Sequence, residues 1–106
     1  MATITKFEDL EIWEEVRRLS KEIIFISKNT ELNKYFKFNA QIKDSSGSVM
    51  DNIAEGFERN GNAEIRQFLS IAKGSAGETR SQLYRVFDNE YIDEEKLKYL
   101  VTVYEN

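Results

Sequence analysis

The chain has 106 residues, with 19 acidic and 15 basic side chains, a formal net charge of −4, and no cysteine, histidine or proline. This length fits one domain, and the missing cysteine and histidine exclude disulfides, thiolate chemistry, the usual zinc sites and histidine-based catalysis. The acidic balance argues against a strongly basic nucleic-acid binder, although a local basic face is compatible with it.

The sequence shows no targeting or membrane segment. Residues 1–6 lack the apolar core of a signal peptide, and no apolar run reaches the ~20 residues of a membrane span. We therefore expect a cytoplasmic protein without a membrane segment. The absence of proline favours long helices, because proline removes a backbone donor and clashes with the preceding turn.

The first predicted helix covers residues 9–28, with Asp9 as its expected N-cap. Apolar residues recur there at steps of three and four, which is the spacing of one helical face. They are Ile12, Val16, Leu19, Ile23 and Ile26. Three more apolar residues, Trp13, Ile24 and Phe25, lie off this stripe. The helix is therefore apolar over more than one face, which indicates an interface with another molecule.

The second and third predicted helices cover residues 35–59 and 62–89, each with an apolar stripe. Asn-Gly at 60–61 is a turn signal between them, and Asn62 is the expected N-cap of the third helix. Because the link is short, we expect the two helices to be antiparallel neighbours.

A hairpin centred between Asn60 and Gly61 predicts which residues face each other. Gly47 then lies opposite Gly74, within the small-residue runs "SSGS" and "GSAG". A glycine inside a helix costs about 1 kcal/mol relative to alanine, so we expect a compensating close approach of the two backbones, or of another helix, at this level.

The fourth predicted helix covers residues 93–106, with Asp93 as its N-cap. Its apolar stripe consists of Leu97, Leu100, Val101 and Tyr104. Four amphipathic helices joined by short links predict an all-α fold, an antiparallel up-and-down four-helix bundle that forms a single domain over residues 1–106.

Three carboxylates on the middle helices, Glu55, Glu64 and Glu78, could suggest a di-metal bundle. That site requires Glu-x-x-His pairs, and the chain has no histidine. We therefore expect no metal and no cofactor, and a cross-helix ion pair between Glu78 and Lys43 is the simpler expectation. No side chain has an evident activating neighbour, so we predict that the protein is not an enzyme.

The segment "NIAEGFERN" is the most unusual part of the second predicted helix. Phe57 points toward the core, while Asn52 and Glu55 flank the apolar stripe and could hydrogen-bond across to the third helix. Gly56 lies one turn before the helix ends, where a side chain would obstruct a neighbouring helix. We interpret this stretch as helix packing, with a ligand or partner contact as the alternative.

A row of basic residues on the third helix is the clearest surface signal. Arg66, Lys73 and Arg80 are seven residues apart, about 10 Å by helical rise, with Arg59 just before them. Such a row could follow a nucleic-acid backbone. The alternative is a solvated face paired with acids of a neighbouring helix.

Three motifs resemble one known family. "FEDLEIWEEV", "NIAEGFERN" and "RQFLSIAKGSAGETRSQL" are similar to the small four-helix-bundle proteins encoded in intervening sequences of bacterial 23S rRNA genes, over about residues 7–91 and in matching order. The resemblance implies an antiparallel bundle that assembles as a homopentamer. It also implies kinship with the accessory variability determinant of diversity-generating retroelements, a basic pentamer that acts with nucleic acid and a reverse transcriptase.

Two positions depart from the pattern of the family. Asp44 stands where relatives usually carry a base, and Met50 stands where they usually carry proline. The first weakens the transfer of nucleic-acid binding, the second favours a straighter second helix, and the fourth helix is expected to be truncated. The positions that match are Asn52, Glu55, Gly56, Phe57, Phe68, Leu69, Ala72, Gly74, Ser75, Glu78 and Leu83.

Two functions remain open from the sequence. The first is a self-associating accessory protein that contacts RNA or DNA through Arg59, Arg66, Lys73 and Arg80. The second is a protein-interaction scaffold that presents an acidic surface to a protein partner.

Overall fold

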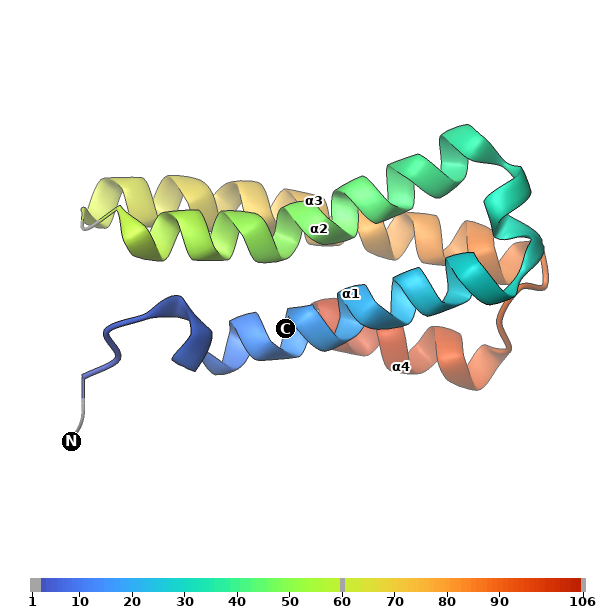
Figure 1. Ribbon diagram of the computed structural model, residues 1–106, viewed down its shortest axis with the longest axis horizontal. Coiled ribbons are helices and arrows are strands. Elements are labelled where there is room, and N and C mark those ends of the chain that lie inside the picture. The colour runs from blue at the N-terminus through green and yellow to red at the C-terminus, as the bar shows by residue number, and fades with distance from the viewer. Residues whose placement is uncertain (1–2, 60, 106) are drawn as a thin grey trace.

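Two long helices form a hairpin along the long axis of the molecule, and two further helices pack below it in the computed structural model (Figure 1). The structure describes residues 3–59 and 61–105. Within them, the elements in chain order are η1 (Phe7–Asp9), α1 (Glu11–Asn29), η2 (Glu31–Lys34), α2 (Phe36–Glu58), α3 (Asn62–Asp88) and α4 (Glu94–Glu105).

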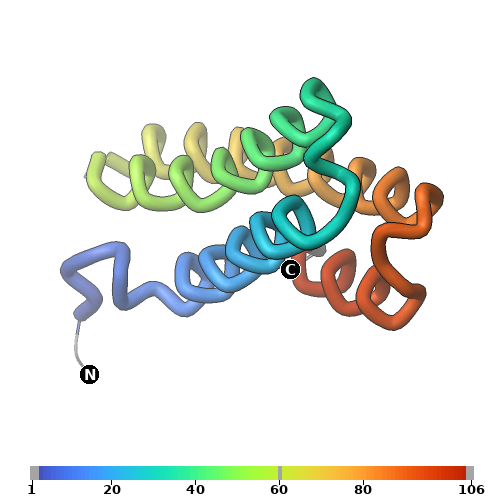
Figure 2. The backbone as a smooth tube through the Cα atoms, turned by 45° about the vertical axis from the view of Figure 1, so that its right-hand side comes forward, coloured from blue at the N-terminus to red at the C-terminus, as the bar shows by residue number. Residues whose placement is uncertain are grey.

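The helices run alternately up and down the molecule. α1 and α2 are linked at one end through η2, α2 and α3 at the opposite end, and α3 and α4 again at the first end (Figures 1 and 2). α2 and α3 make the most extensive contact, while α1 lies against α2 and α4 against α3. This arrangement confirms the predicted all-α four-helix bundle.

The apolar stripes of the four helices meet in one core. Its largest fully buried apolar side chains are Leu19, Ile23, Leu32, Ile42, Leu83, Val86 and Leu100. Full burial of each such side chain stabilises the fold by roughly 1.5–3 kcal/mol. Ile12 was predicted to belong to this core, but it is 41% exposed. It lies in the first turn of α1, beyond the level at which α4 ends.

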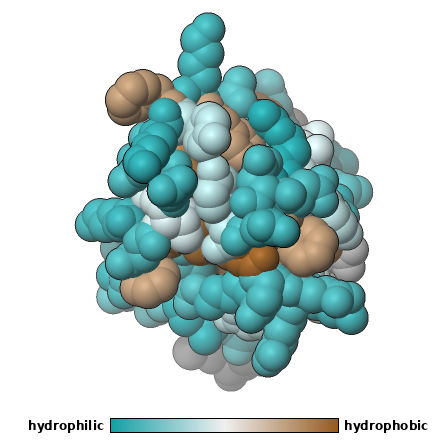
Figure 3. Space-filling model, turned by 90° about the vertical axis from the view of Figure 1, so that its right-hand side faces the viewer, coloured by the Kyte–Doolittle hydropathy of each residue, from teal (hydrophilic) through white to brown (hydrophobic). Residues whose placement is uncertain are grey.

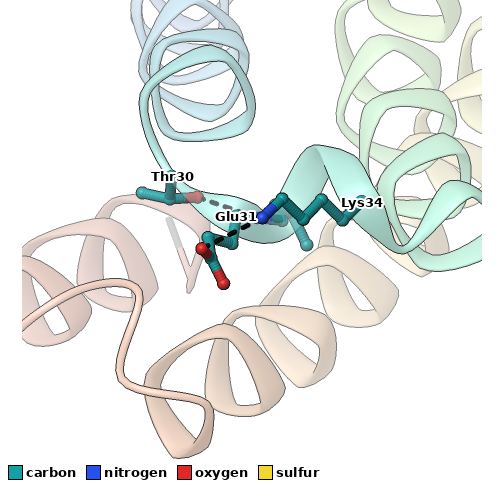
Figure 4. Close-up of polar contacts among 4 residues, drawn as sticks. Thr30, Glu31 and Lys34 are labelled. Atoms are coloured by element: carbon teal, nitrogen blue, oxygen red, sulfur yellow. Dashed lines mark hydrogen bonds and ion pairs between the residues drawn. The ribbon is translucent and has the colours of Figure 1, made fainter.

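The link between α1 and α2 contributes a core residue of its own. Leu32 lies in η2 and is completely buried, although its sequence surroundings "NTELN" predict only a break. The Thr30 hydroxyl accepts a hydrogen bond from the Leu32 amide at 3.2 Å and donates to the Ile26 carbonyl at 2.7 Å. Figure 4 shows this turn with the exposed ion pair of Glu31 and Lys34 on its outer side.

The helix ends agree only partly with the predicted caps. Asp93 accepts a hydrogen bond from the Lys96 amide at 2.8 Å, which confirms it as the N-cap of α4. The prediction that Asp9 is the N-cap of α1 was wrong. Asp9 lies in η1, and the N-cap position of α1 is taken by Leu10, which makes no side-chain cap hydrogen bond. The prediction that Asn62 is the N-cap of α3 was also wrong. Asn62 is the first residue of α3, and Gly61 takes the N-cap position.

The small-residue runs at 45–48 and 74–77 lie level as predicted, because the Ser48 hydroxyl lies 2.9 Å from that of Ser75. The predicted close approach of Gly47 and Gly74 themselves is wrong, since a Cβ atom added to either glycine would meet nothing within 4 Å. The Ser48–Ser75 pair is displaced by two residues from the predicted register. The two helices also pack tightly near Gly56, where an added Cβ would come within 2.9 Å of the Phe68 Cβ. Asn60, the other half of the predicted Asn-Gly bend, lies outside the described residues.

α2 changes direction near its middle (Figure 1). Ser46 there donates a hydrogen bond to the Lys43 carbonyl at 3.2 Å, the Ser45 hydroxyl lies 3.2 Å from the Ile42 carbonyl oxygen, and Gly47 follows. Serine hydroxyls bonded back to the preceding turn, next to glycine, are a recognised cause of helix bending. The bend therefore has a local cause, although Met50 had favoured a straighter helix.

α4 is much shorter than the helix beside it. It has 12 residues and α3 has 27, which correspond to about 18 Å and 40 Å at the helical rise per residue. α4 therefore ends about halfway along the bundle in both views (Figures 1 and 2). The described residues of α4 do not extend along the rest of α3, up to the α2–α3 turn.

Candidate functional site

A seam of polar side chains joins α2 to α3 inside the bundle. The Ser45 hydroxyl donates to the Gln82 side-chain oxygen at 2.6 Å, and the Thr79 hydroxyl donates to Ser45 Oγ at 2.9 Å. All three residues are buried. Buried polar groups are costly unless they are hydrogen-bonded, so this seam holds the two helices in one register.

The seam contains several residues of the family-like pattern. Ser75 contacts Ser48 across the helices, and the Asn52 amide donates to Ser48 Oγ at 2.9 Å within α2. Asn52 was predicted to bond directly to the third helix, and it does so only through Ser48. Glu78 extends the seam at its other end by accepting from Gln82 at 3.3 Å.

Two further expectations about acidic residues were wrong. The predicted ion pair of Glu78 with Lys43 is absent from residues 3–59 and 61–105, and Glu78 bonds to Gln82 on its own helix instead. Glu55 does not reach across to α3, because it pairs with Arg59 one turn later at 2.8 Å. Both acids therefore find partners along their own helices.

Gly56 marks the closest contact of α2 and α3. An added Cβ would collide with the Phe68 Cβ and would also lie 3.6 Å from the Ile65 carbonyl oxygen. The Arg59 guanidinium lies over the Phe68 ring, 5.4 Å from its centre. This geometry supports the interpretation of "NIAEGFERN" as a packing motif, with Phe57 half-buried beside it.

The predicted basic row runs along α3 but does not stay on one surface. Arg66 and Lys73 are exposed, whereas Arg80 is half-buried. A seven-residue repeat drifts around a straight helix by about 20° per step, so the three side chains need not share one surface. Arg59 is exposed and already paired with Glu55. The structure thus leaves Arg66 and Lys73 open to solvent and Arg80 only partly so.

A groove opens where α4 ends. It has a volume of about 420 Å³, and its walls come from α1, α2, α3 and the end of α4. The sequence did not indicate it, since most of its lining residues are apolar residues of the four helices, joined by the charged residues Glu15, Lys73 and Arg80. The signal that could have located it is the short fourth stripe. The lining includes Ile12, Val16, Val49, Leu69, Ala72 and Ala76.

Tyr104 lies at the inner end of this groove and is 5% exposed. Its hydroxyl is buried and has no hydrogen-bond partner within residues 3–59 and 61–105. Burial raises the pKa of Tyr104 well above its usual range, because the phenolate would lose its hydration. An unpaired buried hydroxyl costs about 1–3 kcal/mol.

The remaining expectations concern metals and membranes. Within residues 3–59 and 61–105, no group of three or more acidic side chains converges as metal ligands would. Glu55, Glu64 and Glu78 are all exposed. None of the helices described here is both long and apolar enough for a membrane span.

The comparison with protein families agrees with the motifs. The family model of the 23S rRNA-intervening sequence protein matches residues 8–106. The chain belongs to this family. No curated protein and no solved structure gives a significant match to the chain. This member of the 23S rRNA-intervening sequence family contains a polar seam between α2 and α3, a row of basic residues on α3 and a groove beside the end of α4.

Proposed function

We propose that this protein is a non-enzymatic, cytoplasmic, self-associating bundle that binds RNA or DNA through α3. The observation that carries the proposal is the exposed pair of Arg66 and Lys73, seven residues apart on one helix. Their spacing of about 10 Å places two cations along a line that a sugar–phosphate backbone can follow. Arg59 lies near the start of this line and supplies a third cation.

Membership of the family supports the proposal, since we infer from it the homopentamer and the kinship with the retroelement accessory determinant. Self-association is also supported by exposed aromatic side chains. Phe25 is 62% and Tyr99 50% exposed, and both line one shallow depression at the end of the bundle. Figure 3 shows the apolar areas of this end as separate patches among polar side chains.

The test of nucleic-acid binding is a titration of single-stranded and duplex RNA and DNA at several salt concentrations. Binding should weaken steeply with salt, because phosphate contacts release counterions. The double variant Arg66→Glu and Lys73→Glu should bind at least about tenfold more weakly and lower the salt slope by about 2. The double variant Lys37→Glu and Lys43→Glu, two exposed reversals on α2, is the matched control for net charge.

Absence of binding of every nucleic acid at ~50 mM salt would refute this proposal. An equal loss in the control with Lys37→Glu and Lys43→Glu would also count against α3 as the contact. Light scattering tests the assembly separately, with an expected mass of five times the 12.4 kDa chain.

A second candidate is a scaffold that presents an acidic surface to a basic protein partner. It is favoured by the net charge of −4 and by the exposed acids Glu8 in η1 and Glu11 at the start of α1. Recovery of one basic protein in stoichiometric amount from a pull-down, without nucleic acid, would favour this function over the first.

A further inference from the structure

Three aromatic side chains lie close together in the chain at the start of α2. The segment "YFKF" covers residues 35–38 and follows η2 directly. Phe36 is 81% exposed, more than any other large apolar side chain that the structure describes, and Tyr35 is 58% exposed. Exposed aromatic side chains that cluster, rather than lie singly, mark a surface that another molecule contacts.

Two of these side chains line a small pocket. Its walls come from the start of α2, the end of α3 and the link to α4, and they consist of Tyr35, Phe38, Arg85, Asn89 and Tyr91. These segments meet at one end of the bundle (Figures 1 and 2). The pocket has a volume of about 110 Å³, roughly the space of four water molecules. It therefore has room for one ring rather than for a chain segment.

The walls of the pocket are held in place by local hydrogen bonds. The Asn89 side chain donates to the Arg85 carbonyl at 2.8 Å, and the Tyr91 amide donates to the Val86 carbonyl at 3.2 Å. The rings of Tyr35 and Tyr91 lie 6.4 Å apart, with 47° between their planes. Because the pocket is formed before a ligand arrives, binding requires little further ordering of the protein.

Arg85 gives the pocket its charge. Its guanidinium lies 4.1 Å from the centre of the Phe38 ring, and the side chain is exposed. None of the described residues that line the pocket is acidic, and the nearby acids Asp88 and Glu90 line a separate depression. The pocket thus combines aromatic rings with one cation, which favours a ligand that is flat and carries a negative charge.

A nucleotide has both of these properties, since its base is a flat ring and its phosphate is an anion. Every base can stack on an aromatic side chain, and arginine contributes by stacking or by binding phosphate. A proline-rich peptide also docks against aromatic rings, but it requires a groove that holds several residues. With a single cation at the pocket, stacking rather than charge should supply most of the affinity.

We propose that the pocket between Tyr35, Phe38 and Tyr91 binds one unpaired nucleotide, whose base stacks on the aromatic rings and whose phosphate meets Arg85. The nucleotide is either a free mononucleotide or an unpaired nucleotide of a strand, and only the second case rests on the proposed function. In a strand, the exposed ring of Phe36 offers a second stacking surface from the same turn of α2.

This site is separate from the basic row. Along α3, Arg85 lies about 28 Å beyond Arg66. The pocket also recognises a different part of the ligand, because contacts with phosphates alone do not read bases. The two surfaces can therefore be tested independently.

Two labelled single strands of equal length test the stacking. One consists of thymidylates, and the other has the same sugar–phosphate backbone without bases. Fluorescence anisotropy with the full chain should show that the strand with bases binds about fivefold to a hundredfold more tightly, which is the contribution of stacking one base on an aromatic side chain. A contact with phosphates alone would not distinguish the two strands.

Variants of exposed residues connect this preference to the pocket. Tyr35→Ala should remove most of the preference for the strand with bases. Arg85→Gln should weaken binding of that strand about two- to fivefold, as expected for an exposed ion pair. Tyr84→Ala is the matched control and should change nothing, since Tyr84 of α3 is 50% exposed and does not line the pocket. Circular dichroism checks that each variant folds.

Free thymidylate and adenylate distinguish the two sources of the nucleotide, and their measurement with the parent chain requires no variant. In nuclear magnetic resonance titrations, the base protons of a bound mononucleotide should shift upfield because they lie over an aromatic ring. If the mononucleotide binds as tightly as the strand, the ligand is a free nucleotide. If the strand binds more tightly and Phe36→Ala weakens only the strand, the ligand is an unpaired nucleotide of a strand.

Two results would overturn the proposal. The first is equal binding of the strands with and without bases, together with unshifted base protons of both mononucleotides. The second is a base preference or an upfield shift that a folded Tyr35→Ala variant retains in full.

The double variant Arg66→Glu and Lys73→Glu separates this inference from the proposed function. It should weaken binding of the strand without bases and leave the upfield shift of the mononucleotides unchanged. An upfield shift without any salt-dependent binding of strands or duplexes refutes only the proposed function. Salt-dependent binding that ignores the bases, with no upfield shift, refutes only the nucleotide pocket.

Discussion

Replacing Gly56 by alanine tests the contact that sets the spacing of α2 and α3. The added Cβ would lie 2.9 Å from the Phe68 Cβ, closer than methyl groups approach in proteins. The Phe68 Cβ is attached directly to the α3 backbone, so no side-chain rotation can move it away. Either the two helices separate locally or the backbone of one of them shifts.

The magnitude follows from two opposing effects. Alanine improves helix propensity by about 1 kcal/mol over glycine, while overpacking of a tight contact costs typically about 1–3 kcal/mol. Because the obstructing atom cannot move alone, we expect the upper part of that cost. The free energy of unfolding should therefore fall by about 1–2 kcal/mol.

Gly74→Ala is the matched control. The same added Cβ meets nothing within 4 Å there, so only the propensity gain remains. This variant should raise the free energy of unfolding by about 1 kcal/mol. Urea denaturation followed by far-ultraviolet circular dichroism, at one fixed protein concentration, measures both values.

The reasoning is refuted if Gly56→Ala is as stable as the parent. It also fails if the two variants change stability in the same direction by the same amount, because the steric difference between the two sites is the whole basis of the prediction. A Gly74→Ala variant that is destabilised and also dissociates in light scattering would place Gly74 in an interface between copies.

Three further predictions concern single buried or strained groups. Tyr104→Phe should stabilise the free protein by about 1 kcal/mol, because the lost hydroxyl has no partner. The pKa of Tyr104 is raised in the folded state, so stability should fall as pH rises above 10, and fall less in this variant; urea titrations at several pH values check both. Glu90→Gly should stabilise by about 0.5–1 kcal/mol, since Glu90 has φ 65° in the left-handed region after α3; thermal unfolding measures this. Thr79→Val should destabilise by about 1 kcal/mol, because it removes the donor to Ser45; a Thr79→Ser variant, which keeps the hydroxyl, is its control.

The helices could be predicted because their signals are local. Apolar spacing of three and four residues reports which face of a helix is buried, and it identified Leu19, Ile23, Leu83 and Leu100 correctly. The N-cap Asp93 was also correct. Asp9 and Asn62 were not, because the exact starts of α1 and α3 depend on how the preceding turn packs.

The register of the α2–α3 hairpin could not be predicted closely, because a turn of unknown length shifts every facing pair. A displacement of two or three residues moved the contact away from Gly47 and Gly74. It also replaced the expected pair of Lys43 and Glu78 by the seam through Ser45 and Gln82. Side-chain hydrogen bonds between the two helices depend on this register, and the amino-acid composition does not determine the register.

The candidate sites were likewise only partly predictable from the sequence. The basic row was visible in the sequence because its members are seven residues apart on one helix. The sequence did not show that Arg80 is half-buried while Lys73 is exposed, because this difference depends on the packing of the neighbouring helices. Leu32 gave no periodic signal, and only the packing of η2 shows that it is a core residue.

The amino-acid sequence by itself determined the number, type and order of the helices and their buried faces, since these follow from interactions within one turn. The tertiary structure alone decided the register of α2 against α3, the polar seam between them, and the groove beside the end of α4. Each of these depends on the relative placement of residues far apart in the chain, which is set by packing of whole helices rather than by any local pattern.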